Sequence, residues 1–217
     1  NPQGVANTLN ALSKWPDAKL CAAAASALAL RMATERTVCN AFKPQEVGNA
    51  LNALSKWPAA PHCAAAASVL AARLANDGRL RNGLEAQAAA LVLNALSKWP
   101  DTPDCQDAAN ALASRLSDDP KLCNDLNAQG VASVLNALSK WPDTQVCADT
   151  ASKLAVRLAD EHLLRNSLDP QGVSNVLNAL SKWPAVCATV AEALAARLVA
   201  DPTLCNALDP QGMRSEE

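Results

Sequence analysis

A repeat of constant length constrains the fold of this chain more than any other feature. The phrase LNALSKWP occurs at residues 9–16, 51–58, 93–100, 135–142 and 177–184, without any drift in the spacing. A constant period of about 20 to 50 residues is typical of proteins built from stacked small units, because one unit alone cannot bury its apolar face. We expect a single array, divided at about residues 1–42, 43–84, 85–126, 127–168 and 169–208, with the start of a further unit at 209–213. The chain is therefore expected to be a fragment of a longer protein.

The residues of each unit favour helices. Half of the chain is apolar, and it holds no tyrosine and one phenylalanine; the apolar residues are mostly the helix-favouring alanine and leucine. In segment 169–184, Asp169 is a favourable N-cap and Pro170 suits the first helical position. Val173 and Leu180 then lie on one face, and Pro184 is predicted to end the helix. The same segment recurs after Asn1, Lys43, Glu85 and Asn127, with weaker caps at Lys43 and Glu85.

Two further helices are expected in each unit. Cys147, Ala151, Leu154 and Leu158 form the apolar stripe of a second long helix, and the segment 119–126 predicts a short third one. The connection before the second helix is two residues shorter in the fifth unit. Three helices in each of five equal units predict an all-α fold, an armadillo/HEAT-like right-handed α-solenoid, with the handedness taken by analogy.

Polar residues recur on the first helix of each unit, opposite its apolar face. Around a helical wheel with about 100° per residue, the asparagine and lysine of the repeated phrase share this side with a third, variable position. The fifteen candidate ligand-binding residues are Asn7, Asn10, Lys14, Asn49, Asn52, Lys56, Leu91, Asn94, Lys98, Ser133, Asn136, Lys140, Asn175, Asn178 and Lys182. If the helices stack about 8–10 Å apart, these residues form rows that suit a linear ligand. Lysine can bind a phosphate, and asparagine a base edge or a peptide backbone.

Structural roles for the same residues stay open. Each asparagine can instead bond the backbone of the next unit, and each lysine can balance the dipole at the end of its helix. Recent duplication would also keep residues alike, although the turns after the repeated phrase have diverged, as DAKL, AAPH, DTPD and DTQV show. The tryptophans are either platforms for bases or core residues between neighbouring units, and the second interpretation is favoured.

Other recurring residues have structural interpretations. Late on the second helix, beside its apolar stripe, an arginine recurs that is predicted either to snorkel toward solvent or to cap carbonyl groups, rather than to bind a ligand: Arg31, Arg73, Arg115, Arg157 and Arg197. The glutamine in the first turn of the first helix is predicted to reach back to the cap. The eight cysteines are predicted to be buried free thiols in a reducing compartment, because one recurs in the apolar stripe of every unit.

The composition argues against catalysis, metals and membranes. The chain has two histidines and no CxxC pair, which leaves no ligand set for zinc. No catalytic triad or phosphate-binding glycine loop is present, so we expect no enzyme activity, no cofactor and no small-molecule substrate. The longest apolar run is shorter than the roughly 20 residues of a membrane span. The net charge of −2 excludes a uniformly basic nucleic-acid surface but permits a local basic row.

The phrase SKWP at this spacing, preceded by DPQGV, resembles the SKWP-repeat family of type III secreted effectors from plant-pathogenic bacteria. The resemblance implies a virulence protein delivered into the cytosol, an organelle or the nucleus of a host cell. The segment PQGVANTLNALSKW also resembles octotricopeptide repeats, which act on RNA. The matching residues are Gln3, Val5, Ala6, Asn7, Thr8, Leu9, Ala11, Leu12 and Lys14. Trp15 stands where that family has leucine, which supports a core position for the indole.

Together these patterns predict a non-catalytic recognition scaffold, expected to be a monomer. Its ligand is expected to be single-stranded RNA, bound along the rows of asparagine and lysine. The alternatives are a scaffold that binds a host protein or peptide, and a purely structural spacer.

Overall fold

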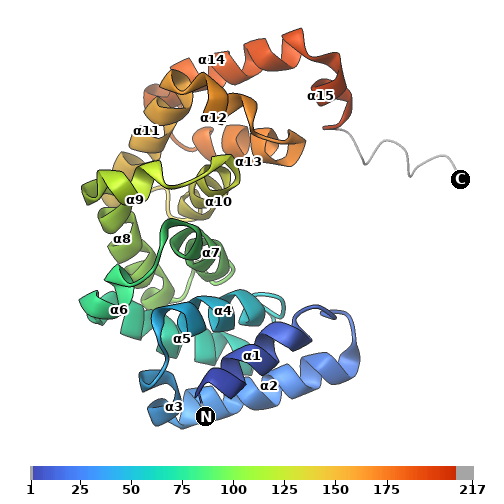
Figure 1. Ribbon diagram of the computed structural model, residues 1–217, viewed down its shortest axis with the longest axis vertical. Helices are drawn as coiled ribbons and strands as arrows, with labels where there is room; N and C mark the ends of the chain where they lie inside the picture. The colour runs from blue at the N-terminus through green and yellow to red at the C-terminus, as the bar shows by residue number, and fades with distance from the viewer. Residues whose placement is uncertain (1, 209–217) are drawn as a thin grey trace, which may run out of the picture.

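The computed structural model describes residues 2–208, and within this range every regular element is a helix (Figure 1). An 11-residue helix opens each unit, and these helices, the A row, are α1 (Pro2–Leu12), α4 (Pro44–Leu54), α7 (Ala86–Leu96), α10 (Ala128–Leu138) and α13 (Pro170–Leu180). The B row of longer helices is α2 (Lys19–Thr34), α5 (Pro61–Asn76), α8 (Pro103–Asp118), α11 (Gln145–Asp160) and α14 (Pro184–Ala200). The C row of five-residue helices is α3 (Arg36–Asn40), α6 (Gly78–Asn82), α9 (Pro120–Asn124), α12 (His162–Asn166) and α15 (Pro202–Asn206). The expected cap at Asn1 and the further unit at 209–213 lie outside the described residues.

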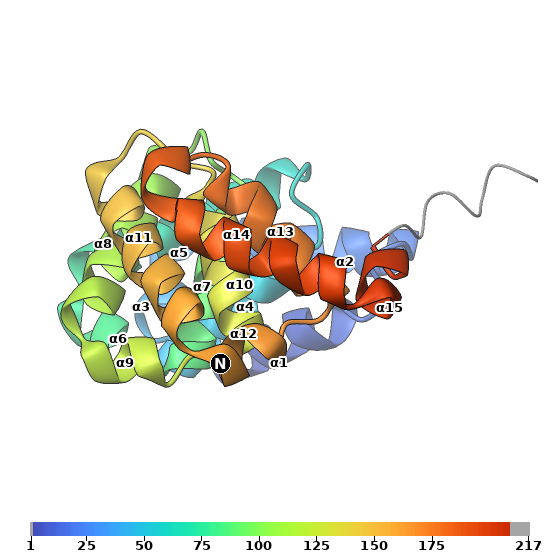
Figure 2. The ribbon, with the colours of Figure 1, turned by 90° about the horizontal axis from the view of Figure 1, so that it is seen from above.

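Equivalent helices pack side by side along the chain. Each A helix contacts the next A helix, and each B helix contacts the next B helix. Every C helix packs against the B helix that precedes it. Figure 1 shows that the rows follow an arc, with α4, α7 and α10 on its inner side and α5, α8 and α11 on its outer side. Figure 2, seen from above, shows α8 and α11 of the B row to one side of α7 and α10 of the A row. The side of the A helices that faces away from the B row therefore faces the inside of the arc.

The starts of the A helices follow the sequence closely. The carboxylate of Asp169 accepts a hydrogen bond from the Gly172 N–H at 2.6 Å, and the Asn127 side chain caps α10 in the same way. No side-chain cap is formed by Lys43 or Glu85, as expected from their weaker capping ability.

The ends of the A helices differ from the prediction. Each A helix ends at the second leucine of the repeated phrase rather than at the proline. The serine that follows donates its hydroxyl to the asparagine carbonyl three residues earlier, at 2.7–2.8 Å in every unit. The next two N–H groups also bond three residues back, as Lys98 and Trp99 do. These tighter bonds satisfy the terminal carbonyls and end the α-helix before the proline is reached.

The apolar stripes predicted for the second helix are confirmed. Cys147, Ala151, Leu154 and Leu158 are fully buried in α11. In α2 the equivalent Cys21 is only half-buried, because no described unit packs on that side. The shortened connection of the fifth unit lies in the loop, where α14 begins directly after the turn of residues 181–183.

The tryptophans lie between neighbouring units, as the core interpretation predicts. Trp57, Trp99, Trp141 and Trp183 are 5–8 % exposed. Each indole N–H donates a hydrogen bond of 2.9–3.0 Å to the proline carbonyl that ends the phrase of the preceding unit. Trp15, which has no described unit before it, is 62 % exposed. The indole therefore joins one unit to the unit before it and is not a platform for bases.

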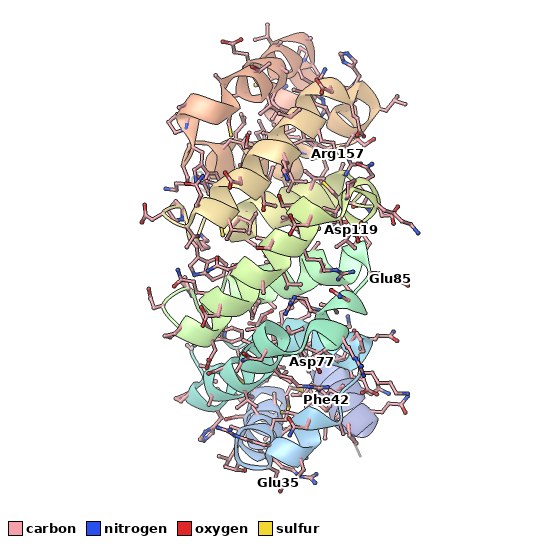
Figure 3. All side chains as sticks on the ribbon, turned by 90° about the vertical axis from the view of Figure 1, so that its left-hand side faces the viewer. Glu35, Phe42, Asp77, Glu85, Asp119 and Arg157 are labelled. Carbon is pink, nitrogen blue, oxygen red and sulfur yellow. The ribbon has the colours of Figure 1, made fainter. Side chains whose placement is uncertain are left out.

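From the second unit onward the recurring arginines cap carbonyl groups of the preceding unit, whereas Arg31 forms an ion pair with Glu35. Arg115 donates to the carbonyls of Arg81, Asn82 and Leu84, at the end of α6. Arg157, labelled in Figure 3, does the same at the end of α9. Figure 3 looks on the outer side of the arc, where Asp77 and Asp119, between the B and C helices, follow one another along one edge. A second donor thus joins each pair of neighbouring units.

The cysteines are free thiols within the described residues, but their burial varies. Five are buried, as predicted, whereas Cys21 and Cys123 are half-buried and Cys205 is exposed, which corrects the prediction for these three. At the position of the C row where cysteine and arginine alternate, three of the five residues form the same kind of hydrogen bond. Cys39 and Arg81 each donate to the carbonyl seven residues earlier, at 3.3 and 2.7 Å, and Arg165 does so at 2.9 Å. Both residue types therefore supply a donor to the end of the preceding B helix.

Candidate functional site

The predicted binding residues share one face of the A row. We call this face, made of the three positions per unit predicted from the sequence, the polar stripe. Its five lysines are exposed, and four of its five repeated asparagines are half-exposed while Asn178 is exposed. At the variable position Asn7 and Leu91 are exposed, and the other three residues are half-exposed. Because the opposite face of each A helix is buried in the core, the polar stripe faces the inside of the arc.

The side chains of the repeated asparagines and lysines are not used by the fold. Within residues 2–208, the side chains of Asn10, Asn52, Asn94, Asn136 and Asn178 form no hydrogen bond, and neither do those of the five lysines. The backbone carbonyl of each asparagine accepts a hydrogen bond from the hydroxyl of the serine that follows its helix, but the amide side chain is not used. The alternative that these asparagines bond the backbone of the next unit is therefore not found. Their amides keep both donors and acceptors available to a ligand.

The lysines of the polar stripe have no acidic partners. The ion pairs within the described residues all involve arginine: Arg31–Glu35, Arg73–Asp77 and Arg157–Glu161. An aspartate follows three residues after the lysine in three units, but none of these carboxylates forms an ion pair with a lysine in the described part of the chain. The inner side of the arc therefore carries a row of lysines that form no ion pair with a described carboxylate, although Glu46 and Glu85 line the hollow on the same face.

A row of glutamines extends the polar stripe, and the sequence analysis missed it. Gln3, Gln45, Gln87, Gln129 and Gln171 are all exposed. They were expected to reach back to the helix cap, but no such hydrogen bond forms among the described residues. Gln171 instead donates to the Asn175 side chain, four residues later, at 3.0 Å. The spacing could have revealed this row, since residues 3, 7, 10 and 14 fall within about 60° on a helical wheel.

Two hollows lie between neighbouring A helices along this face. The first has a volume of about 760 Å³ and is lined by residues of α1, α4 and α7, among them Gln3, Gln45, Gln87 and Asn49. The second, of about 220 Å³, lies between α7 and α10, and Asn94 and Ser133 border it. Both are open to solvent, so the glutamine row and the variable position line shallow grooves rather than an enclosed pocket. Such grooves suit an extended chain better than a small molecule.

Neither a cluster of metal ligands nor a membrane-spanning helix is found within residues 2–208. No group of three or more histidine, cysteine, aspartate or glutamate side chains is placed to hold a metal ion there. The search of these residues also finds no helix with the length and apolar character needed to cross a membrane. Burial raises the pKa of the Cys39 thiol to about 11 and that of Cys105 to about 12, so these thiols stay protonated and unreactive at neutral pH.

Comparisons with known proteins do not identify the chain. It matches no model of a protein family, no curated protein and no solved structure.

Proposed function

We propose that this protein is a non-catalytic recognition scaffold that binds single-stranded RNA along the inner side of its arc. In this proposal the three rows form an armadillo/HEAT-like right-handed α-solenoid, and each unit adds one glutamine, one variable residue, one asparagine and one lysine to the binding face. The likeness to SKWP-repeat effectors supports a function in a host cell, after delivery by a bacterial type III system.

The lysine row is the observation that carries the proposal. Lys14, Lys56, Lys98, Lys140 and Lys182 are exposed, equally spaced in the sequence and without acidic partners among the described residues. A row of unpaired cations matches a polymer that carries one negative charge per monomer. Lysines that neutralise phosphates release counterions, which supplies most of the affinity for nucleic acid when no base is recognised.

The amides beside the lysines supply the contacts that a backbone-only site would lack. The asparagine side chains have free donors and acceptors, and the edges of unstacked bases present groups of both kinds. No aromatic residue belongs to the polar stripe, and four of the five tryptophans are buried, so hydrogen bonds would hold the bases rather than stacking.

An extended polypeptide is the second candidate, and the paired amide rows favour it. The glutamines and asparagines run parallel along the hollows of the A row. Amide side chains can bond the N–H and C=O groups of an extended backbone, as grooves that bind peptides do. Capture of a host protein that survives nuclease treatment, and that is lost on changing Asn52, Asn94 and Asn136 to alanine, would support this candidate.

The proposal is tested by the salt dependence of RNA binding. A fluorescein-labelled pool of random-sequence single-stranded RNA is titrated with the protein, and anisotropy is measured at several salt concentrations. If each of the five lysines binds a phosphate, the logarithm of the association constant falls with the logarithm of salt concentration with a slope of about −3.5, or about −0.7 per contact. Changing Lys56, Lys98 and Lys140 to glutamate is expected to reduce this slope by at least about 2 and to leave the thermal melt unchanged.

A matched control uses three cations outside the polar stripe. Lys19, Arg79 and Lys121 are exposed and belong to the B and C rows. Changing them to glutamate alters the net charge equally, and RNA binding should weaken far less. The proposal would be contradicted if both triple variants weakened RNA binding equally, or if the association constant did not change with salt concentration. A sharp drop in the melting temperature of the first variant would assign the lysines a structural role.

A further inference from the structure

We infer that the variable position of α7 contacts the bound RNA without discriminating between bases, because Leu91 stands there in place of a hydrogen-bonding side chain. This inference rests on the proposed function and adds to it a prediction of sequence preference. The base that lies over Leu91 could be of any kind, whereas the bases over the variable positions of the neighbouring A helices could not. Asn94 of α7 keeps the contact that the proposed function gives to every unit.

Leu91 is the apolar exception in an otherwise polar position. The equivalent residues are Asn7, Asn49, Ser133 and Asn175, each of which carries a donor and an acceptor. Leu91 is 48 % exposed, so it is not recruited into the core. A single exposed leucine is ordinary on a protein surface. This leucine is distinguished by its place on the one face whose other units keep a polar residue.

Leu91 also borders both hollows of the inner face. It lines the hollow between α4 and α7 together with Asn49, and the hollow between α7 and α10 together with Ser133. Ala88, one turn earlier on α7, lines the first hollow beside it. A chain that follows the A row from one hollow to the next must therefore pass over this apolar point, between two half-exposed polar residues.

The consequence for recognition follows from the chemistry of the side chains. An amide can discriminate between bases because each base edge presents a different order of donors and acceptors, and a well-placed pair discriminates by about 5- to 150-fold. A leucine side chain offers only van der Waals contact, which every base accepts. Gln87 lines the same hollow as Leu91 and can contact the backbone of the RNA.

The experiment compares sequence preferences in a random pool. The protein is incubated with random-sequence single-stranded RNA, bound molecules are sequenced, and the enrichment of each base is measured along the recovered motif. Wild-type protein should enrich a motif with preferred bases on either side of a position without preference. The variant Leu91→Asn should introduce a preference of about 5-fold or more at that position.

The reciprocal variant provides the matched control. Asn49 lines the same hollow and its side chain makes no hydrogen bond within the described residues, so Asn49→Leu should remove one preference and leave the others. Binding of the pool without any change of motif between wild type and both variants would overturn this inference and leave the proposed function intact. Failure of the wild-type protein to bind the pool would overturn both. A preference already as strong at the base over Leu91 as at the neighbouring positions would overturn the inference alone.

Discussion

The contact between Trp99 and the preceding unit should contribute to the free energy of unfolding by an amount that can be calculated from the structure. Trp99 is 7 % exposed, whereas Trp15, the same residue in the first unit, is 62 % exposed. Packing against a preceding unit therefore removes about half of the surface of a tryptophan side chain from water. The indole N–H also gains a hydrogen bond of 3.0 Å to the carbonyl of Pro58.

The two contributions set the expected magnitude. If about half of the roughly 200–250 Å² surface of a tryptophan side chain is removed from water, roughly 110–140 Å² is buried, which is worth about 3 kcal/mol at about 25 cal/mol per Å². The hydrogen bond adds about 1 kcal/mol. We therefore expect Trp99→Ala to lower the free energy of unfolding by about 4 kcal/mol more than Trp15→Ala. Trp99→Phe keeps an aromatic ring but removes the N–H donor and leaves the Pro58 carbonyl unbonded. It should therefore lower the free energy of unfolding by roughly 1–2 kcal/mol.

Urea unfolding followed by circular dichroism at 222 nm measures these differences. Because stability in a stacked array is close to a sum of unit and interface terms, loss of a central interface should also broaden the transition or split it. Trp15→Ala serves as the control, since it removes the same side chain where no described unit packs against it. A difference below about 1 kcal/mol between the two alanine variants would refute the assignment of the indole to the interface between units.

Two further predictions concern the arginines and the thiols. Arg115→Met should lower the free energy of unfolding by about 2–3 kcal/mol, because it leaves three carbonyls without their charged donor. Arg31→Met should cost under about 1 kcal/mol, since Arg31 only forms an exposed ion pair with Glu35. Thermal melts of both variants and of the wild type measure the two losses of stability. For Cys39, burial raises the pKa from 9.0 to about 11, so the folded state holds its proton more tightly than the unfolded state. Its contribution to stability should therefore be intact below about pH 9 and should fall as the pH rises to about 11, by about 2–3 kcal/mol in total, and the urea midpoint of Cys39→Ala should lose this part of the pH dependence. If the urea midpoint of Cys39→Ala fell with rising pH as steeply as that of the wild type, the raised pKa of the Cys39 thiol would be contradicted.

The positions of the helices could be predicted because their signals are local. Caps such as Asp169, prolines at helix starts and apolar residues spaced along one face are all properties of short segments. The end of each A helix could not be located from the proline, because the serine hydroxyl bonds backward and ends the helix earlier. The proline was the stronger signal in the sequence, but each A helix ends at the second leucine of the phrase, before the chain reaches the proline.

The contacts between units could be predicted only in part. The burial of the tryptophans follows from their apolar surroundings, but their carbonyl partners lie 41 residues away in the sequence. The arginines of α5, α8 and α11 reach back to carbonyls of the preceding C helix and of the leucine or phenylalanine after it, so their capping role was predicted and their target was not. No local pattern records how far apart two units lie once they stack.

For the candidate site, the helical periodicity predicted that the repeated asparagines and lysines share one face of the A helix. It could not predict on which side of the arc that face lies. Curvature depends on the relative sizes of the A and B rows, which single helices do not reveal. The glutamine row was assigned to capping because a first-turn glutamine often serves that purpose. The structure leaves those side chains exposed, and the hollows they line became visible only once neighbouring helices were in place.

The direction of the bonds between units has a consequence for biosynthesis. The indole and guanidinium donors at the interfaces belong to the later unit and reach back to carbonyls of the earlier one. A chain synthesised from its N-terminus therefore produces the carbonyl acceptors before the indole and guanidinium donors. Each new unit can then pack against a preceding unit that has already been synthesised. Vectorial assembly of this kind lets the array grow on the ribosome without waiting for segments not yet translated.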